Sequence, residues 1–582
     1  MAKKSKRKTS SVAATQARAK PVPMKKPVPK KKPVPKNEPV QLKEKAMATR
    51  VTVAGSQRTL LPHSRPAGPV DPSETASLTI RLRSSGDTAA LEKRVKEQAA
   101  LPLAQRTYLT HEELAAAHGA KTEDLDLVEK LAHEHDLMVV HRNKAEHTIV
   151  LKGKLGDLLS MFPADVQNYH HSNGSYRGRQ GEIQMPQALE GVVTGVFGFD
   201  TRPKHRYLHR GYRASAGPGG QNGVPSTEFA ARYNFPKTYQ GQTLDGSGQT
   251  IAIIELGGGF RASDLKVYFH EIGVARPTVT RVVVDHAKHS PTTADSDDGE
   301  VMLDIEVAGA VAPKARIAVY FAPNNGDKGF IDGISAAVHD AERKPSVISI
   351  SWGGPESTTD TQGIQAFHEI FVAAAALGIT ICVASGDHGT ADEASPDWDG
   401  KIHVDHPAVD DLVLGCGGTQ IDAKGKDVVW NDGTPFDTNV AGGGGWASGG
   451  GISEVFAVPA YQQSANLPVS IASGKAGRGV PDIAMSATNY FTRVDRQEGA
   501  SGGTSAVAPL MAALVALLNQ AKNKNVGFLN TLLYANAGTL LHDVTVGTNA
   551  IHNTVKGYKA GPGWDACCGL GTPDGAAILS KL

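Results

Sequence analysis

The sequence predicts an α/β protein: a parallel β-sheet with helices on both faces, preceded by a smaller α+β domain. A chain of 582 residues is too long for one compact core, so two or three domains are expected. The second half alternates short apolar runs with helical stretches, which is typical of a parallel sheet covered on both faces. The 63 glycines favour a loop-rich α/β body over a helical bundle.

Residues 1–50 are predicted to form a disordered Lys/Pro-rich tail. They hold 16 Lys and Arg against two Asp and Glu, so the remaining chain has a formal net charge of −12 although the whole is +2. A Lys-Pro-Val-Pro unit repeats between Lys25 and Lys36, and alternating proline excludes helix and favours polyproline II. Such a tail either binds an anionic surface or nucleic acid or is a disposable leader. No apolar segment follows the basic start, so it is not a standard secretory signal peptide.

Residues 51–205 are predicted to form a separate α+β domain. LTIRLRS from Leu78 alternates like a strand, and Thr110 to Glu113 form a capping box before a short helix. A helical stripe follows at Leu125, Val128, Leu131 and Ala132. LMVVHRN and HTIVLKG then pair as strands, and LGDLLSMF is a second helix. Helices interleaved with strands in this way indicate a split βαβ, ferredoxin-like arrangement.

Residues 206–227 have the composition of an exposed, easily cut linker, RYLHRGYRASAGPGGQNGVPST. The α/β body, residues 228–582, follows. Its buried strands are predicted at TIAIIELGGG, RIAVYFAP, VISISWGG, ITICVASGD and LVLGCGGT. In parallel sheets of this kind, sites gather at the carboxyl ends of the strands.

Composition favours neither a membrane-spanning protein nor a small protein held together by disulfide bonds. No apolar run is expected to reach the roughly 18 residues that cross a bilayer. The nearest is FVAAAALGITICVAS, which Gly378 divides into a helix end and a strand. The four cysteines, Cys382, Cys416, Cys567 and Cys568, are too few for a disulfide framework and are expected to be buried or idle thiols.

Ser505 is the first candidate for chemistry. Gly502-Gly503-Thr504 allow a tight turn, and AVAPLMAALVALL continues as an apolar helix. The hydroxyl then lies at a helix N-terminus, where the dipole favours developing negative charge. The alternative is a simple cap on a core helix.

Glu300 and Asp304 are the second candidate, because their spacing of four places both carboxylates on one helix face. The neighbours Val301, Leu303, Val307 and Ala308 make that helix largely apolar. Two acids held together in an apolar setting share a proton and titrate together, which suits a base of tunable strength. The alternative is a solvated acidic patch beside Glu306.

The turn after ITICVAS offers Asp387 and His388, and residue order alone does not choose between them. A histidine in a turn is expected to be exposed to solvent and without a role. His388 as the base of a serine nucleophile would require a histidine-dependent, neutral-pH peptidase.

Together, Gly-Thr-Ser-Ala-x-x-Pro at 503–509, SISWGG at 349–354, ASGD at 384–387 and the Glu-x-x-x-Asp helix resemble the sedolisins, the serine-carboxyl peptidases, and among them the kumamolisin type. The resemblance covers about residues 51–582. It implies a subtilisin-like fold and a Ser-Glu-Asp triad without histidine. Ser505 would be the nucleophile, Glu300 its general base, Asp304 the support of Glu300 and Asp387 the oxyanion-hole residue.

The same resemblance assigns further roles. Glu255 and Trp352 match a network behind the acidic pair, and Gly353, Gly354 and Asp405 match the substrate cleft. Asp387 can donate to an oxyanion only when protonated, while Glu300 must accept a proton, so a bell-shaped acidic pH optimum is expected.

A calcium loop is implied at the C-terminus, where one Ca²⁺ would bind the carboxylates of Asp543 and Asp565 and the carbonyls of Val544, Gly561 and Gly563. Without the resemblance, a glycine-rich turn with chance aspartates would remain the simpler interpretation. Cys567 and Cys568 directly follow the last ligand, and nothing in the pattern explains Cys568.

The resemblance also implies that residues 51–205 are an inhibitory pro-domain and that cleavage occurs between Arg213 and Gly220. Acid would weaken carboxylate–Arg contacts and start self-processing. Protein or peptide substrates, a monomer and work outside the cell are expected. A non-catalytic homologue is the remaining alternative, against which Glu300, Asp304, Asp387 and Ser505 argue because all four are present.

Overall fold

The computed structural model describes residues 49–171, 174–202, 205–207, 210–212, 223–393, 398–437, 443–552 and 554–582. The basic tail up to residue 48 and the cleavage zone expected at 213–220 lie outside the described residues, so both remain predictions. Residues 49–582 form one compact unit.

The body is built on one large sheet, in the strand order β15-β16-β14-β17-β19-β21-β22, with β27 paired to β21. Every neighbouring pair is parallel except β21–β22. All five predicted strands and the predicted parallel sheet are confirmed, and one short edge strand, β22, is antiparallel. A tight turn at Asp422–Lys426 returns the chain antiparallel at that edge. The strands are β14 (Thr250–Glu255), β15 (Thr278–Val283), β16 (Arg316–Phe321), β17 (Val347–Ile350), β19 (Thr380–Ala384), β21 (Leu414–Ile421), β22 (Asp427–Val429) and β27 (Ile483–Ser486).

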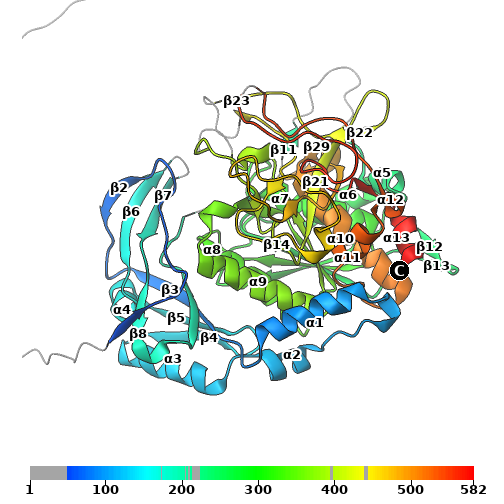
Figure 1. Cartoon of the computed structure of the whole chain (residues 1–582). Coiled ribbons are helices and arrows are strands. Elements are labelled where there is room, and N and C mark those ends of the chain that lie inside the picture. Colours follow the sequence, from blue (N-terminus) through cyan, green and yellow to red (C-terminus); the bar gives the residue numbers. More distant parts are fainter. Residues whose placement is uncertain are drawn as a thin grey trace, which may run out of the picture. The chain divides into compact units, whose positions relative to one another are not determined.

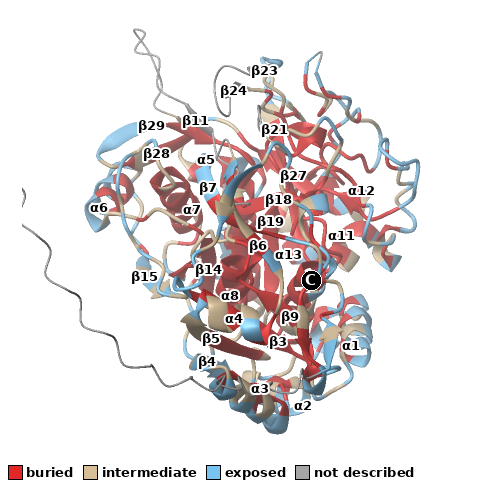
Figure 2. Ribbon diagram, turned by 90° about the vertical axis from the view of Figure 1, so that its left-hand side faces the viewer, coloured by how far each residue is buried: buried red, intermediate tan, exposed pale blue. Residues whose placement is uncertain are grey.

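Helices cover both faces of this sheet, as predicted (Figure 1). Alternate residues of β14 show how: Ile251 and Ile253 pack with α7 (Asp298–Val311) and α10 (Val507–Lys522). Ala252 and Ile254 pack on the other side with α8 (Asp327–Val338) and α9 (Thr361–Ala376). Burial on both faces accounts for the continuous apolar composition of the strands. In Figure 2 the central strands and α7 and α8 are accordingly buried.

The stretch Thr504–Lys522 corrects the expectation that no apolar run is long enough to cross a bilayer. Its 19 residues have a mean hydropathy of 1.5 in the most apolar window, yet 94% of that window is buried inside the protein. This is the pattern of a core helix, and α10 indeed packs against β14, β17, β19 and β21. The four cysteines are buried and free, as expected.

The N-terminal domain contains the predicted elements. A four-stranded antiparallel sheet has the order β4-β5-β3-β9, and a second sheet, β2-β6-β7, was not anticipated. The capping box at Thr110 is confirmed: Thr110 Oγ1 accepts from the Glu113 amide, and the Glu113 carboxylate accepts from the Thr110 amide. The elements are β2 (Arg65–Pro69), β3 (Thr75–Leu82), α1 (Thr88–Ala100), α2 (His111–His118), α3 (Thr122–Glu134), β4 (Met138–Asn143), β5 (Thr148–Lys154), α4 (Leu155–Met161), β6 (Asp165–His171), β7 (Gly174–Gln180) and β9 (Val193–Phe197).

This domain has its own apolar core and packs β9 against α9 of the body. Its helix α1 also packs against α9 (Figure 1). The body also contains the helices α5 (Ser226–Arg232), α6 (Ala262–Glu271), α11 (Asn530–Ala535) and α13 (Gly575–Lys581). Shorter strands outside the large sheet are β10 (Arg206–Tyr207), β11 (Arg210–Tyr212), β18 (Trp352–Pro355), β20 (Asp405–His406), β28 (Tyr490–Val494) and β29 (Gln497–Gly502).

Candidate active site

The predicted acidic pair lies on the buried helix α7. Glu300 and Asp304 are both 0% exposed, which excludes a solvated acidic patch. Ser351, at the carboxyl end of β17, donates its hydroxyl to both oxygens of Asp304, at 3.0 and 2.9 Å. Asp304 is thereby held in place, whereas the Glu300 oxygens make no hydrogen bond within the part of the chain that the structure describes.

Burial raises the pKa of Glu300 well above its ordinary value, and the nearby charges of Asp304 and Glu255 raise it further. Burial also raises the pKa of Asp304, although the hydrogen bonds from the Ser351 hydroxyl oppose this. The third acid, Glu255 at the end of β14, accepts from the Trp352 indole at 2.9 Å. Because like charges so close together repel, the presence of Glu255 and Asp304 disfavours ionisation of Glu300.

Ser505 lies directly before α10, in a short turn of residues 504–506. Gly503 has φ +112°, a conformation that favours glycine, and a side chain at Gly502 would collide with the Ala487 carbonyl. The Ser505 hydroxyl donates to the Ser351 carbonyl at 3.4 Å, and Ser351 in turn bonds Asp304. One serine of the SISWGG motif therefore joins the candidate nucleophile to the acidic pair.

Asp387 lies at the carboxyl end of β19 and is tied to the residue before the candidate nucleophile. The Thr504 amide and the Thr504 hydroxyl both donate to Asp387 Oδ1, each at 2.8 Å. The other oxygen of the Asp387 carboxylate, Oδ2, accepts neither of these two hydrogen bonds. Ser505, Glu300 and Asp387 are all nearly or completely buried in this full-length chain.

The expectation that His388 is exposed was wrong. His388 is 8% exposed, its Nδ1 lies 3.2 Å from the Gly445 carbonyl oxygen, and its ring packs on Trp446 with centroids 4.7 Å apart. The pairing of His388 with Ala447 explains this burial, because the glycine-rich loop folds over the turn. No hydrogen bond joins His388 to Ser505 in the described ranges, so a histidine-dependent mechanism has no support from the geometry.

The predicted cleft residues line a strand beside Ser351. β18 carries Gly353 and Gly354 and pairs antiparallel with β20, which carries Asp405. A Cβ on Gly353 would lie 2.3 Å from Asp405 Oδ2, so the glycine leaves room for the carboxylate. Asp405 is completely buried.

Two short strands of the linker flank Ser505. β10 pairs antiparallel with β18, and β11 pairs antiparallel with β29, whose last residue is Gly502. Substrate peptides commonly bind by adding a strand to an exposed sheet edge. The linker thus occupies both edges that an extended peptide would use.

The C-terminal loop brings the two candidate calcium carboxylates together. Burial raises the pKa of Asp565, and the negative charge of the nearby Asp543 raises it further. The amide of Gly563 donates to Asp543 at 2.8 Å and that of Gly561 to Asp565 at 3.1 Å, so the loop wraps around both. Among the described residues, no hydrogen bond reaches the carbonyl oxygens of Val544, Gly561 or Gly563. Two carboxylates and three available carbonyls match the oxygen ligands that calcium prefers.

Sequence reasoning missed three residues near the site: Ser351, Thr504 and Asp392. Ser351 and Thr504 adjoin the predicted Trp352 and Ser505, so motif position was the available signal. Asp392 is buried and lies near Asp405 and Asp387, and burial together with those charges raises its pKa. No pattern in the sequence pointed to Asp392.

Comparisons with known proteins agree with this arrangement. Residues 62–202 match the family model "Pro-kumamolisin, activation domain", and residues 287–571 match the subtilase family. The chain is 43% identical to kumamolisin of Bacillus sp. (strain MN-32), over 92% of this chain and 96% of the relative. It is 28% identical to sedolisin of Pseudomonas sp. (strain 101), over 74% of each chain, and 27% identical to human tripeptidyl-peptidase 1, over 90% and 95%.

A solved structure, Pseudomonas sedolisin (serine-carboxyl proteinase) complexed with two molecules of pseudo-iodotyrostatin, superimposes with a TM-score of 0.51 at 29% identity. The superposition covers 60% of this chain and 96% of that one.

Proposed function

Because this chain belongs to the sedolisin family of serine-carboxyl peptidases and resembles its kumamolisin type, we propose that it is an acid-active endopeptidase made as a self-processing precursor, with Ser505 as nucleophile. The observation that carries this proposal is the chain of contacts from Ser505 through Ser351 to the buried pair Glu300–Asp304, with Asp387 fastened to Thr504 beside it.

In the proposed reaction, Ser505 Oγ attacks the scissile carbonyl and its proton passes to Glu300. When Glu300 and Asp304 together hold one proton, the pair still has one negative charge. The pair can therefore act as a base and accept the proton of Ser505. Ser351 and Asp304 position Glu300 during this transfer. The proton then passes to the leaving amine. Water, deprotonated by the same pair, attacks the acyl-enzyme, and the pair returns that proton to Ser505 Oγ as the acyl group leaves.

Asp387 stabilises the oxyanion of each tetrahedral intermediate. Since Thr504 already donates two hydrogen bonds to Oδ1, a protonated Asp387 carries its proton on Oδ2 and can donate it to the oxyanion. An ionised Asp387 would repel the oxyanion instead.

The pH dependence follows from these two roles. At low pH the pair Glu300–Asp304 takes up its second proton and loses its basicity, and at higher pH Asp387 loses the proton it must donate. We expect a bell-shaped curve of kcat/KM with its maximum in acid, measured on a quenched fluorescent peptide between pH 2 and 8. A maximum near pH 8 would contradict the assignment.

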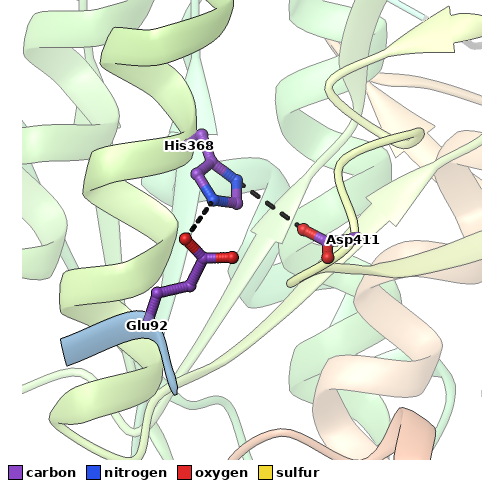
Figure 3. A group of neighbouring side chains, drawn as sticks. All are labelled: Glu92, His368 and Asp411. Carbon is purple, nitrogen blue, oxygen red and sulfur yellow. Dashed lines mark ion pairs between the residues drawn. The ribbon is translucent and has the colours of Figure 1, made fainter. Parts of the chain in front are cut away.

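The precursor is held together by charged contacts between the pro-domain and the body. Figure 3 shows His368 of α9 between the carboxylates of Glu92 and Asp411. Lys96 bonds Glu92 at 2.6 Å and Asp411 at 2.8 Å, supplying the positive charge that a metal ion would otherwise supply. Deeper in the interface, Arg58 contacts Asp327 at 2.7 Å.

These contacts respond differently to acid. Hydrogen bonding to His368 lowers the pKa of Glu92 to about 2, so its contribution is complete above its ordinary pKa of 4.5 and is lost as the pH falls towards 2. For His368, the neighbouring carboxylates outweigh burial and raise the pKa to about 11, so it stays protonated throughout acid activation. Neither group titrates in mild acid.

Two partly buried histidines at the same interface are expected to take up protons in mild acid once the interface opens. His147, in the turn between β4 and β5, and His339, after α8, line a small cavity with Arg81, His118, Glu146 and Glu369. Burial and the charge of Arg81 lower the pKa of His147 to about 3, and burial lowers that of His339 to about 4 despite the opposing charge of Glu146. The closed precursor therefore favours neutral imidazoles. The two neutral histidines contribute their full stabilisation to the closed precursor above pH 6.5, their ordinary pKa. This stabilisation is lost as the pH falls from 6.5 towards the lowered pKa values of about 4 and about 3.

Replacing His147 by glutamine is expected to shift the half-maximal pH of self-processing downwards, because one group that drives release no longer takes up a proton. The measurement is the rate of precursor cleavage between pH 3 and 7, followed by mass spectrometry. His133→Gln, an exposed histidine of α3, is the matched control and should behave as wild type. An unchanged pH midpoint in His147→Gln would contradict this role.

We propose that one calcium ion binds to Asp543, Asp565 and the carbonyls of Val544, Gly561 and Gly563. A bound cation would neutralise the two facing carboxylates and hold the loop in place, which is a structural rather than a chemical contribution. Export from the cell and a monomeric state stay predictions.

Removing calcium with EGTA is expected to lower the thermal midpoint of the uncleavable Ser505→Ala precursor. Calcium at 100 times its dissociation constant would contribute about 2.7 kcal/mol of stability through binding to the folded state alone. Differential scanning calorimetry checks this, with Asp543→Asn expected to be insensitive to EGTA. Equal midpoints with and without EGTA would contradict the site.

A further inference from the structure

We propose that Glu306 is a positioning residue of the active site. As a neutral carboxylic acid it joins α7 to strand β28, and this contact holds the acids Glu300 and Asp304 in place relative to Ser505. The inference rests on the proposed peptidase function and adds to it a residue that acts through other residues and does not touch the substrate.

Glu306 lies on α7 on the side away from Asp304. Each residue of an α-helix is turned by about 100° from the one before it, so side chains two residues apart point in nearly opposite directions. Glu306 is 0% exposed, and α7 packs against α6 and β28 (Figure 2). One helix thus carries the acidic pair on one side and a further buried acid on the other.

The partner of Glu306 is a backbone amide at the edge of a small sheet. In the strand order β11-β29-β28, β28 is an edge strand, so its outward amides need acceptors from elsewhere. The amide of Phe491 donates to the Val224 carbonyl at 2.9 Å. Two residues further on, the amide of Arg493 donates to Glu306 Oε2 at 3.0 Å. Alternate amides of a strand face the same side, so Glu306 takes the place of a further strand residue at this edge.

The hairpin of β28 and β29 connects this contact to the candidate nucleophile. The two strands pair antiparallel, and the hydroxyls of Thr492 and Ser501 lie 2.8 Å apart across the ladder. β29 ends at Gly502, three residues before Ser505. A displacement of the hairpin from α7 would therefore change the distance between Ser505 and Glu300.

The surroundings of Glu306 favour its neutral form. Its second oxygen, Oε1, makes no hydrogen bond within the ranges that the structure describes. The Arg493 guanidinium pairs with other acids, since its Nε lies 3.6 Å from Asp264 Oδ1 and its Nη1 contacts Glu498. Burial raises the pKa of Glu306 well above its ordinary value, and the charge of Asp264 raises it further. A buried carboxylate without a cation is costly, so Glu306 keeps its proton.

The other elements around α7 do not offset this effect. α6 contributes Asp264 and the buried phenol of Tyr268, and β14 contributes Glu255, which lies beside the acidic pair. α10 has no ionisable side chain before its last residue, and those of α5 are exposed. Because folding raises the pKa of Glu306, this acid costs no stability below its ordinary pKa of 4.5 and destabilises the fold increasingly as the pH rises above that value.

The first experiment measures kcat and KM of the mature enzyme with one quenched fluorescent peptide. Glu306→Gln keeps an acceptor for the Arg493 amide and is always neutral, so its kcat at the acidic optimum should match the wild type. Glu306→Met has a similar size but no acceptor. It should lower kcat by about 10–100-fold with KM unchanged, because a small misplacement of reacting groups is enough to slow catalysis. Glu271→Gln, an exposed acid at the end of α6, is the matched control and should behave as wild type. Equal losses in Glu306→Gln and Glu306→Met, or a wild-type kcat in Glu306→Met, overturn the proposal.

The second experiment uses pH and decides the question even if Glu306→Met does not fold. The enzyme is held between pH 5 and 8 for a fixed time and then assayed at pH 4. Because Glu306→Gln has no proton to lose, its pH of half-inactivation should lie at least about 0.5 units above that of the wild type. Glu271→Gln should keep the wild-type value. An unchanged midpoint in Glu306→Gln overturns the neutral state of Glu306.

A third arm does not depend on catalysis. In the Ser505→Ala precursor, Glu306→Met should speed hydrogen exchange of the Arg493 amide by about 10-fold or more relative to Ser505→Ala alone, whereas Glu306→Gln should not. Unchanged exchange in Glu306→Met overturns the contact. If the wild type hydrolyses no peptide and exchange is nevertheless faster in Glu306→Met, the peptidase assignment falls and the link between α7 and β28 is supported.

Discussion

Replacing Ser505 by alanine is expected to leave the purified precursor intact at pH 4, where the wild-type precursor cleaves itself. The hydroxyl is the only group of the chain that the proposed mechanism uses as a nucleophile, and loss of a serine nucleophile lowers kcat by about 10⁶-fold. Mass spectrometry of both precursors over time reports the cleavage, and the wild-type sample also identifies the bond that is cut.

The matched control is Ser486→Ala, a buried serine of β27 whose hydroxyl contacts only the nearby Thr488 carbonyl among the described residues. It should mature as wild type does. Maturation of Ser505→Ala at the wild-type rate, in a preparation free of other proteases, would show that Ser505 is not the nucleophile.

Replacing Asp387 by alanine is expected to lower kcat by about 10²–10³-fold at the acidic optimum, the usual loss when one oxyanion donor is removed. The substrate should still bind, because Asp387 acts on charge that develops only in the transition state. The measurement is kcat and KM of the mature enzyme with one peptide. A loss seen in KM alone would assign Asp387 to substrate binding.

Asp387→Asn separates the oxyanion role from a structural one. Thr504 donates twice to Oδ1, so the amide oxygen would take that place and the amide nitrogen would take the place of Oδ2. An amide donates at every pH, whereas a carboxyl donates only when protonated. The alkaline limb of the pH curve is therefore expected to move to higher pH in Asp387→Asn. A limb that stays in place would show that another group sets it.

Local chemistry explains why much of the fold could be predicted. The apolar runs of β14, β16, β17, β19 and β21 are long enough and apolar enough to be buried strands whatever surrounds them. The capping box at Thr110 involves residues three apart, so its partners are present in the sequence itself. Glu300 and Asp304 share a face of α7 for the same reason.

Other features depend on contacts between distant segments. The burial of His388 comes from residues 445–447, and the hydroxyl that orients Asp304 comes from Ser351, 47 residues away. The linker was expected to be an exposed loop, yet its described residues include two strands that pair with β18 and β29. Strand pairing of this kind is non-local, and no pattern within residues 206–212 indicates it.

By itself, the sequence determined which residue types are available and in which local order. It places an acidic pair on an apolar helix, a serine directly before a second apolar helix and an aspartate at the end of a strand, and these motifs indicate the family. The tertiary structure alone decided which of them meet. It removed Glu300 and Asp304 from water, joined Asp304 to Ser505 through Ser351, and paired the Arg206 guanidinium with Glu393. The physical reason is that helix faces and caps arise from neighbours within a few residues, whereas burial, pKa and substrate contacts arise from packing between segments that lie far apart in the chain.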